Sequence, residues 1–393
     1  MFIRREVGGL ETKHAGRSRN AVCYVVPYYA TTDDQHFAHL PAFLTRLAKV
    51  CELYVIVERG SNLPQVPGAR VMLQKVNAGN RVRRYVEFLS LVRLVRKAGC
   101  RRFFVRISKG AALALILTSP FLDTELYYWH SGDVGRAPRS DLPRARLRIE
   151  ELITQFVVRR ANRFVTGPES MVDYYVNRFG ADPARCVVLY NDIDLSALED
   201  PSPEATRQAR QALSLDNQPV FALFTARLSF GKGGDLLPLI VDRLERLSSP
   251  LQMIVIGRPE LDGIEEQLAR RTMIHFVGSL PSGRVHAYRQ ASDIAILPSR
   301  SEGFPRTLIE AMASGLPVVL FDAGGVRDLL GPRQQRFVVP PGDLDTFAQL
   351  LHELTVTPKL RSELGAENLQ QVQRFSSDRV VEMFVDRIVE PRI

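Results

Sequence analysis

The sequence predicts an α/β fold made of two parallel sheets, each covered by helices on both faces. First, the 393-residue chain exceeds the size at which one hydrophobic core usually stops growing. Second, short β-branched or aromatic segments alternate with helical patterns in both halves of the chain. Third, residues 194–206 (DLSALEDPSPEAT) are rich in turn formers and acids, which is typical of a linker between domains.

The expected elements follow that alternation along the chain. In the first half, a strand at 20–26 and a helix at 37–51 precede further strands at 52–58, 102–108, 125–131, 163–167 and 186–191. In the second half we expect helices at the end of the chain and strands at 219–225, 251–257, 273–278, 293–299 and 316–321. The carboxyl ends of parallel strands share one edge of a sheet, so a ligand cleft is expected where those edges face the other domain.

Composition fits an ordinary globular protein, with 45% hydrophobic and 24% charged residues. The basic N-terminus has no apolar run after its charges, so it does not match a secretory signal. The apolar run at 111–117 is too short to span a bilayer. Cys23, Cys51, Cys100 and Cys186 lack the spacing of a zinc site or a disulfide framework. We therefore expect a cytoplasmic protein with reduced thiols.

Positive charge is concentrated in the first half. Residues 1–195 contain 30 Lys and Arg against 18 Asp and Glu, whereas the rest of the chain contains 22 against 25. Between Arg70 and Lys109, twelve basic residues accompany one acid, Glu87. This asymmetry suggests an anionic partner for the first half alone.

Within this segment a basic helix is expected at 81–97. Its apolar residues recur at helical spacing, at Val82, Tyr85, Val86, Leu89, Val92 and Val95. Such a helix could lie on an anionic membrane surface. Nucleic acid is the rival partner, but no RNA- or DNA-binding module accompanies the charge, so the membrane is preferred. A merely solvated basic face remains an open alternative.

A glycine-rich turn at 226–234 (ARLSFGKGG) stands between an expected strand and an expected helix. Such a turn lets backbone amides approach phosphate oxygens, and Arg227 and Lys232 could bracket a diphosphate. The stretch matches neither the Walker loop nor the G-x-G-x-x-G pattern. A solvated turn with incidental charges is the alternative interpretation.

The stretch at 298–319 (PSRSEGFPRTLIEAMASGLPVV) places two carboxylates around the start of a helix. Glu302 lies in the loop after a strand, Pro305 suits the first helical turn, and Gly315 ends the helix that carries Glu310. A carboxylate can accept two hydroxyls of a sugar or ribose, while the helix N-terminus offers amides to an anion. Structural capping by Glu302 is the alternative.

This stretch resembles the E-x7-E signature of retaining glycosyltransferases of family 4, with the ending EAMASGLPVV. Upstream, ARLSFGKGG resembles the R-x4-K donor loop of that family, FDAGGVRDLL resembles its later glycine pair, and VLYNDID stands where N-G-x-D is usual. The resemblance covers residues 185–345 closely and the first half only by layout. It implies the GT-B fold, two Rossmann-like domains facing a central cleft.

By that resemblance, residues 1–195 form the acceptor domain and 196–375 the donor domain, while a helix over 376–393 could cross back. Arg227 and Lys232 would neutralise the diphosphate leaving group. Glu302 would hold the transferred sugar, and Glu310 the ribose hydroxyls. The expected donor-binding residues are Arg227, Lys232, Val277, Gly278, Glu302, Gly303, Phe304, Arg306, Thr307 and Glu310.

The first half contributes one expected site residue, His130, which follows the strand pattern ELYYW. The family often has a histidine there, near the sugar or acceptor, and a purely structural histidine is the alternative. His130 completes a predicted catalytic set with Glu302, Arg227 and Lys232.

Two departures from the family pattern affect these expectations. The first loop has no Gly-Gly pair, and Asp33, Asp34 and His36 could replace its acceptor contacts, although a solvated loop is the simpler account. Asp192 replaces the usual glycine and creates a D-x-D triplet with Asp194, which mimics a metal-binding motif. Because the triplet lies at the linker, no metal is expected.

The predicted function is transfer of a sugar from a nucleoside diphosphate sugar to an acceptor hydroxyl, with retention of the anomeric configuration. The expected acceptor is a glycan or lipid-linked molecule, such as a cell-surface polysaccharide precursor. We expect no cofactor and no nucleic acid, and a cytoplasmic location that could include the inner face of the membrane. Two alternatives remain, a non-catalytic nucleotide-sugar-binding subunit and a GT-B sugar-nucleotide epimerase.

Overall fold

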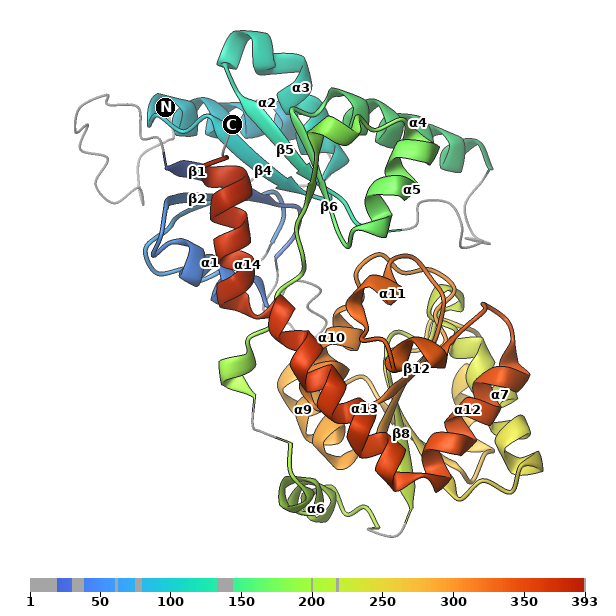
Figure 1. The fold of residues 1–393 in the computed structure, drawn as a ribbon. Helices are drawn as coiled ribbons and strands as arrows, with labels where there is room; N and C mark the ends of the chain where they lie inside the picture. Colours follow the sequence, from blue (N-terminus) through green and yellow to red (C-terminus); the bar gives the residue numbers. More distant parts are fainter. Residues whose placement is uncertain are drawn as a thin grey trace.

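The chain forms two α/β domains, one above the other in the view of Figure 1. The computed structural model describes residues 20–29, 39–60, 63–74, 80–132, 144–198, 201–216 and 219–391, without the side chains of Arg81, Arg144 and Ser282. In these ranges, a seven-stranded parallel sheet forms the centre of the first domain and a six-stranded parallel sheet that of the second. The expected fold class is therefore confirmed.

The first sheet has the strand order β3-β2-β1-β4-β5-β6-β7. Its strands are β1 (Ala21–Val26), β2 (Glu52–Val57), β3 (Arg70–Leu73), β4 (Arg102–Arg106), β5 (Glu125–Trp129), β6 (Arg163–Thr166) and β7 (Cys186–Val188). β1 and β2 are buried on both faces, which is why their sequences are nearly continuous apolar runs.

Helices cover both faces of the first sheet. One face carries α1 (Leu40–Leu47), and the other carries α2 (Arg81–Lys97), α3 (Lys109–Leu122), α4 (Arg144–Arg160) and α5 (Ser170–Phe179). α2 begins where the Asn80 side chain accepts a hydrogen bond from the Arg83 amide at 3.0 Å. One face of α2 packs into the core through Phe88, Val92 and Val95.

The second sheet has the order β10-β9-β8-β11-β12-β13. Its strands are β8 (Val220–Thr225), β9 (Leu251–Ile256), β10 (Ile274–Gly278), β11 (Ile294–Leu297), β12 (Val318–Phe321) and β13 (Val338–Val339). The helices around it are α6 (Pro203–Ala212), α7 (Leu237–Arg246), α8 (Ile264–Ala269), α9 (Ser282–Ala291), α10 (Arg306–Ala313), α11 (Val326–Leu329), α12 (Leu344–Val356) and α13 (Pro358–Gln371).

The end of the chain returns to the first domain. After α13 comes α14 (Ser377–Phe384), drawn in red in Figure 1, which packs beside α1. Val380 and Phe384 are buried in the core on that face of the first sheet. The Phe384 ring lies 4.9 Å from the Phe104 ring, measured between centroids. The last segment therefore stabilises the domain that begins the chain.

Three elements differ from the sequence-based expectation. β3 and β13 are additional edge strands, and β13 has only two residues. α6 starts at Pro203, inside the expected linker, and packs against α9. The linker composition concealed this helix because proline and serine are also the residues that begin helices.

Both sheets change direction at a similar place. Strand order reverses between β1 and β4 in the first sheet and between β8 and β11 in the second. In open α/β sheets, ligands bind beyond the carboxyl ends of the strands at such a switch point. The loops after β8 and β11 contain the glycine-rich turn and Glu302, so the fold brings together two motifs 70 residues apart in the sequence.

Candidate active site

Two loops of the second domain pack against each other at the switch point. The Arg300 amide, after β11, donates to Gly231 O, after β8, at 2.9 Å. Arg300 also forms an ion pair with Asp235 at 2.7 Å. Gly233 has a φ of +73°, and a Cβ there would lie 2.0 Å from Pro298 O, so only glycine fits. The glycine-rich turn is therefore fixed against the loop that carries Glu302.

Lys232 and Glu302, both predicted site residues, form an ion pair across these loops. Lys232 Nζ lies 2.7 Å from Glu302 Oε1. Glu302 is 7% exposed, whereas the lysine side chain is 29% exposed. Because an unpaired charge is costly to bury, the lysine stabilises the carboxylate in this position. The structure thus brings the expected leaving-group cation and the expected sugar-binding carboxylate together.

Glu310 lies in α10 and contacts two arginines. Arg289 Nη1 is 2.6 Å from Glu310 Oε2, and Arg306 Nε is 3.8 Å from Glu310 Oε1. Arg289 is a buried residue of α9 that the sequence analysis did not identify. Its partner is 21 residues away in the sequence, and no motif marks the pair. The two guanidinium groups orient the carboxylate.

Three other predicted donor residues, Arg227, Val277 and Gly278, are more exposed to solvent than Glu302. Arg227 is 57% exposed and pairs with Glu260, 3.1 Å away. Val277 and Gly278 end β10, and both are half-buried. Arg227 therefore approaches a different carboxylate from the one that Lys232 holds.

The start of α10 joins the second domain to the linker. Arg306 and Thr307 are its first two residues, and the Arg306 guanidinium donates to Asp192 O at 2.8 Å. Phe304 O accepts a hydrogen bond from the Asn191 side chain at 3.0 Å. The Phe304 ring is buried and packs the junction between the domains, so only the backbone of this predicted residue can line a donor site.

The Glu302 loop also touches the first domain. A Cβ on Gly303 would lie 2.5 Å from Gly132 N, and a Cβ on Gly325 would lie 2.3 Å from Pro168 Cγ. Glycine at both positions therefore permits close contact between the domains, backbone to backbone at Gly303 and against the Pro168 ring at Gly325. His130 lies two residues before Gly132, and Glu302 lies one residue before Gly303. The two predicted site residues therefore approach the Gly132–Gly303 contact from opposite domains.

His130 follows β5 and is half-buried. Its Nδ1 hydrogen-bonds to the Tyr175 hydroxyl, and its ring stacks on that of Tyr128 with 6.1 Å between centroids. Burial, with a smaller contribution from Lys109, lowers the pKa of His130 to about 3. The imidazole is therefore neutral at physiological pH, and its contribution is a hydrogen bond instead of a charge.

The two acids of the D-x-D triplet have separate partners. Asp192 accepts a hydrogen bond from Ser377 Oγ at 2.7 Å, and Asp194 pairs with Arg46 at 2.8 Å. Across the ranges that the structure describes, no three His, Cys, Asp or Glu side chains gather into a metal site. The first-loop candidates Asp33, Asp34 and His36 lie outside those ranges.

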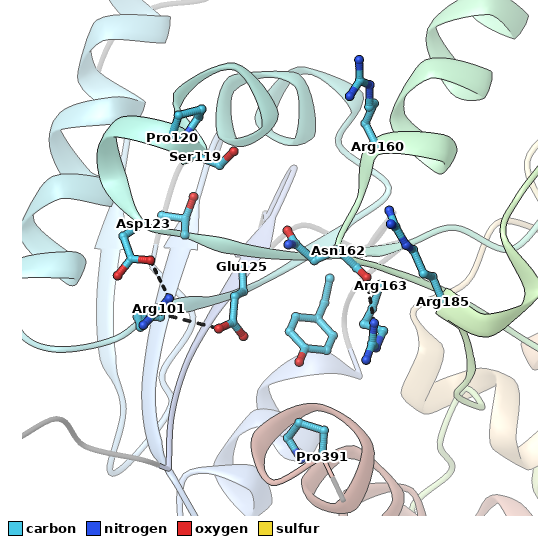
Figure 2. Close-up of a pocket in the computed structure, with 12 residues that line it drawn as sticks. Arg101, Ser119, Pro120, Asp123, Glu125, Arg160, Asn162, Arg163, Arg185 and Pro391 are labelled. Carbon is cyan, nitrogen blue, oxygen red and sulfur yellow. Dashed lines mark hydrogen bonds and ion pairs between the residues drawn. The ribbon is translucent and has the colours of Figure 1, made fainter. Parts of the chain in front are cut away.

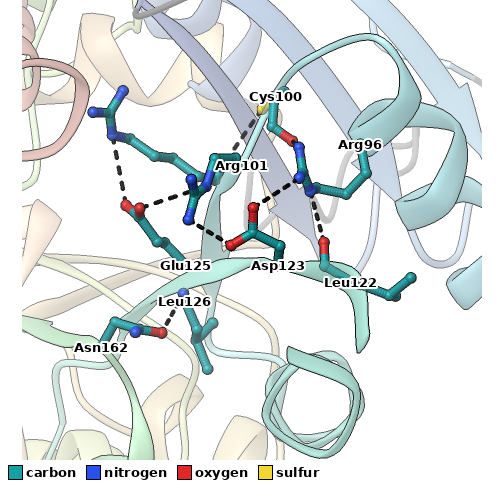
Figure 3. Close-up of polar contacts among 9 residues, drawn as sticks. Arg96, Cys100, Arg101, Leu122, Asp123, Glu125, Leu126 and Asn162 are labelled. Carbon is teal, nitrogen blue, oxygen red and sulfur yellow. Dashed lines mark hydrogen bonds and ion pairs between the residues drawn. The ribbon is translucent and has the colours of Figure 1, made fainter. Parts of the chain in front are cut away.

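A hollow of about 660 Å³ lies at the opposite edge of the first sheet, where β5 and β6 begin. Figure 2 shows Glu125 and Arg163 among its lining residues, and none of the predicted site residues lines it. Arg101 pairs with Asp123 at 2.5 Å and with Glu125 at 3.8 Å, in the network drawn in Figure 3. The acids of this hollow are thus neutralised, and it is separate from the candidate site.

Comparison with known sequences supports the motif analysis. Residues 205–371 match the family model described as Glycosyl transferases group 1. The chain is similar to a D-inositol 3-phosphate glycosyltransferase of Gordonia bronchialis, with 28% identity over 244 residues, 58% of this chain and 52% of the relative. A protein of the same name from Kribbella flavida is 28% identical over 286 residues, 63% of this chain and 66% of the relative. The match thus spans about half the length of the Gordonia relative.

Solved structures share both domains. A structure of Anabaena Alr3699/HepE in complex with UDP and glucose has a TM-score of 0.71 at 17% identity, covering 93% of this chain and 98% of that one. Sucrose-phosphate synthase from Thermosynechococcus elongatus has a TM-score of 0.74 at 14% identity, covering 93% and 97%. At such identities the likeness shows the fold alone, over 93% of this chain.

Proposed function

We propose that the chain transfers a sugar from a nucleoside diphosphate sugar to an acceptor hydroxyl, because residues 205–371 match the family model of glycosyl transferases group 1. The GT-B fold, shared with solved structures over 93% of the chain, supports this function. Retention of the anomeric configuration, as in family 4, is part of the proposal. The spacing of Glu302 and Glu310 supports retention, and the UDP in the HepE complexes supports a nucleoside diphosphate donor.

The observation that carries the proposal is the Lys232–Glu302 ion pair at the switch point, beside the contact with Gly132. In the donor complex, the diphosphate becomes the partner of Lys232, and Glu302 accepts hydroxyls of the transferred sugar. The first amides of α10 add donors for a phosphate oxygen. Catalysis then consists of positioning and of stabilising the charge that develops on the diphosphate.

The remaining donor contacts follow from the same arrangement. Glu310, oriented by Arg289, accepts the ribose hydroxyls, and Val277 with Gly278 borders the base. Arg227 is exposed enough to exchange Glu260 for the diphosphate. Two cations of the chain thereby take the place that a metal ion holds in other transferases, so turnover should survive a strong chelator.

A thermal-shift screen of UDP-, GDP- and ADP-sugars tests donor binding, because a ligand that binds only the folded state raises its apparent stability. Product analysis by NMR then reports the anomeric configuration. Inversion would contradict the family 4 mechanism, and loss of turnover in EDTA that Mn²⁺ restores would contradict metal independence. Epimerised donor without acceptor would favour the epimerase, and binding without turnover would favour the non-catalytic subunit.

For the acceptor, we propose a glycan or lipid-linked molecule met at an anionic membrane surface. None of the helices in the described ranges is both long and apolar enough to span a bilayer. The outer face of the neighbouring helices α2, α3 and α4 exposes large apolar side chains. They are Val82, Tyr85, Val86, Leu94, Leu117, Phe121, Ile149, Leu152 and Phe156.

This face, which we call the apolar-basic face, differs from the stripe that the sequence predicts on α2 alone. Val92 and Val95 of that stripe are buried in the core. Exposed cations stand between the apolar side chains, at Arg83, Arg93, Lys97, Arg146 and Arg148. Apolar groups together with cations fit an anionic lipid surface, which offers both an acyl boundary and negative charge.

A further inference from the structure

We propose that Tyr175 fixes His130 in the tautomer whose proton is on Nδ1, which leaves Nε2 as a bare hydrogen-bond acceptor at the carboxyl edge of the first sheet. Tyr175 acts through His130, so it is a positioning residue. The catalytic consequence rests on the proposed function. The tautomer is a property of the protein without substrate and can be tested alone.

The argument begins with the protons available to the Tyr175 hydroxyl. Its oxygen forms one hydrogen bond to Gly132 O, at 3.0 Å, and another to His130 Nδ1. A carbonyl oxygen only accepts, so the hydroxyl gives its single proton to Gly132. The second bond then requires a proton from the imidazole. Nδ1 must therefore carry it.

The surroundings hold this arrangement in place. Tyr175 is fully buried in α5, and its ring lies 4.6 Å from that of Phe164 and 5.5 Å from that of Phe179, measured between centroids. The His130 ring stands edge-on to Tyr175 at 5.9 Å. A neutral imidazole carries one proton, so Nδ1–H implies an unprotonated Nε2.

An unprotonated Nε2 selects the kind of group that His130 can bind. It accepts a hydrogen bond from a hydroxyl, and it cannot donate one to a phosphate or carbonyl oxygen. The proposed partner is therefore a hydroxyl of the transferred sugar or of the acceptor. Because Tyr175 also bonds to Gly132, whose backbone contacts Gly303, the same side chain aligns His130 with the Glu302 loop.

Long-range ¹H–¹⁵N spectra of the full-length protein, labelled at its seven histidines, report the tautomer directly. His130→Gln identifies the signal. We expect the Nδ1–H pattern at pH 7, and a partial or complete change to the Nε2–H pattern in Tyr175→Phe. Tyr174→Phe removes a hydroxyl from the adjacent residue of the same helix and should change nothing. An Nε2–H pattern in the unaltered protein overturns the proposal, as does an unchanged pattern in Tyr175→Phe.

Kinetics with a donor sugar test the positioning role. Tyr175→Phe should lower kcat on the order of 10-fold or more with little change in donor KM, because a wrong tautomer loses a bond that matters in the transition state. The double variant Tyr175→Phe/His130→Gln should be no slower than His130→Gln alone. Additive losses would contradict the role. If the tautomer is as stated but no donor turns over, the proposed function fails and the tautomer assignment stands.

Discussion

Lys232 forms an ion pair with Glu302 and, in the proposed donor complex, with the diphosphate. Lys232→Ala should lower kcat on the order of 100- to 1000-fold, as loss of one electrostatic donor typically does. The buried Glu302 also loses its partner, so the free energy of unfolding should fall by about 1–3 kcal/mol. Steady-state kinetics and urea denaturation measure the two effects separately.

Glu310→Ala provides the comparison for that variant. A ribose contact is remote from the bond being broken and is similar in the ground and transition states, so its loss should mainly raise donor KM. A near-normal kcat in Lys232→Ala would refute its leaving-group role. The same kinetic pattern in both variants would show that the two residues do not bind separate parts of the donor, the diphosphate and the ribose, as proposed.

His130 makes stability depend on pH. Its pKa is about 3 in the folded chain and about 6.5 in an unfolded one, so the unfolded state binds more protons between these values. Stability is therefore lost as the pH falls below about 6.5, and at pH 5 the loss from this residue should be about 2 kcal/mol. Urea denaturation at pH 7 and pH 5 measures it, with His130→Gln as the reference. Equal pH dependence in both proteins would mean that the pKa of His130 is not lowered in the folded chain.

Sequence motifs identified the candidate donor-site residues more readily than the residues that hold them in position. Lys232 and Glu302 lie in motifs, and the fold pairs them as neighbours. Arg289 and Tyr175 were not predicted, because each acts through a partner on another element, 21 and 45 residues away. A single sequence gives no signal for such pairs, since an arginine or a tyrosine on a helix is usual for many reasons.

At the scale of elements, the apolar-basic face of α2, α3 and α4 should bind anionic vesicles. Binding should weaken with salt and largely disappear at 1 M, where the screening length is about 3 Å. Arg83, Arg93 and Lys97 are exposed, whereas Arg84 is half-buried and the side chain of Arg81 lies outside the described residues. Changing the first three to Glu should therefore reduce sedimentation with vesicles and leave donor affinity intact.

Apolar contact is tested by Leu152→Ser on this face, with Leu239→Ser on α7 of the second domain as the matched control. Both side chains are exposed, at 63% and 43%. Only the first substitution should weaken vesicle binding. Equal sedimentation with neutral and anionic vesicles would leave the basic segment as a solvated face.

Most strands were predictable because their buried sequences are dense in β-branched and aromatic residues. β3 was not, since an edge strand needs no such density and Arg70–Leu73 is partly exposed. The exposed apolar residues of α3 and α4 were also missed. The side that a helix buries depends on where it crosses the sheet, and sequence periodicity alone does not decide this.

At the scale of the whole molecule, α14 makes the last residues part of the first domain. Its Phe384 is fully buried among the rings of Phe104, Tyr24 and Phe43. The two domains otherwise have separate cores on separate sheets. Their unfolding transitions should therefore respond to different substitutions, even where the residues changed are close in the sequence.

Phe384→Ala should lower the stability of the first domain by about 3–5 kcal/mol, the usual cost of deleting a buried aromatic ring. The single tryptophan, Trp129, is buried in β5, so its fluorescence reports unfolding of that domain alone. Phe347→Ala, in the core of the second domain, is the matched control. It should lower the midpoint of the unfolding transition followed by circular dichroism and leave the midpoint followed by fluorescence unchanged. Phe347 precedes Phe384 by fewer than 40 residues, yet the two rings are buried in the cores of different domains. If both variants shift the fluorescence midpoint equally, the domains unfold as one unit, and the packing of α14 does not separate their stabilities.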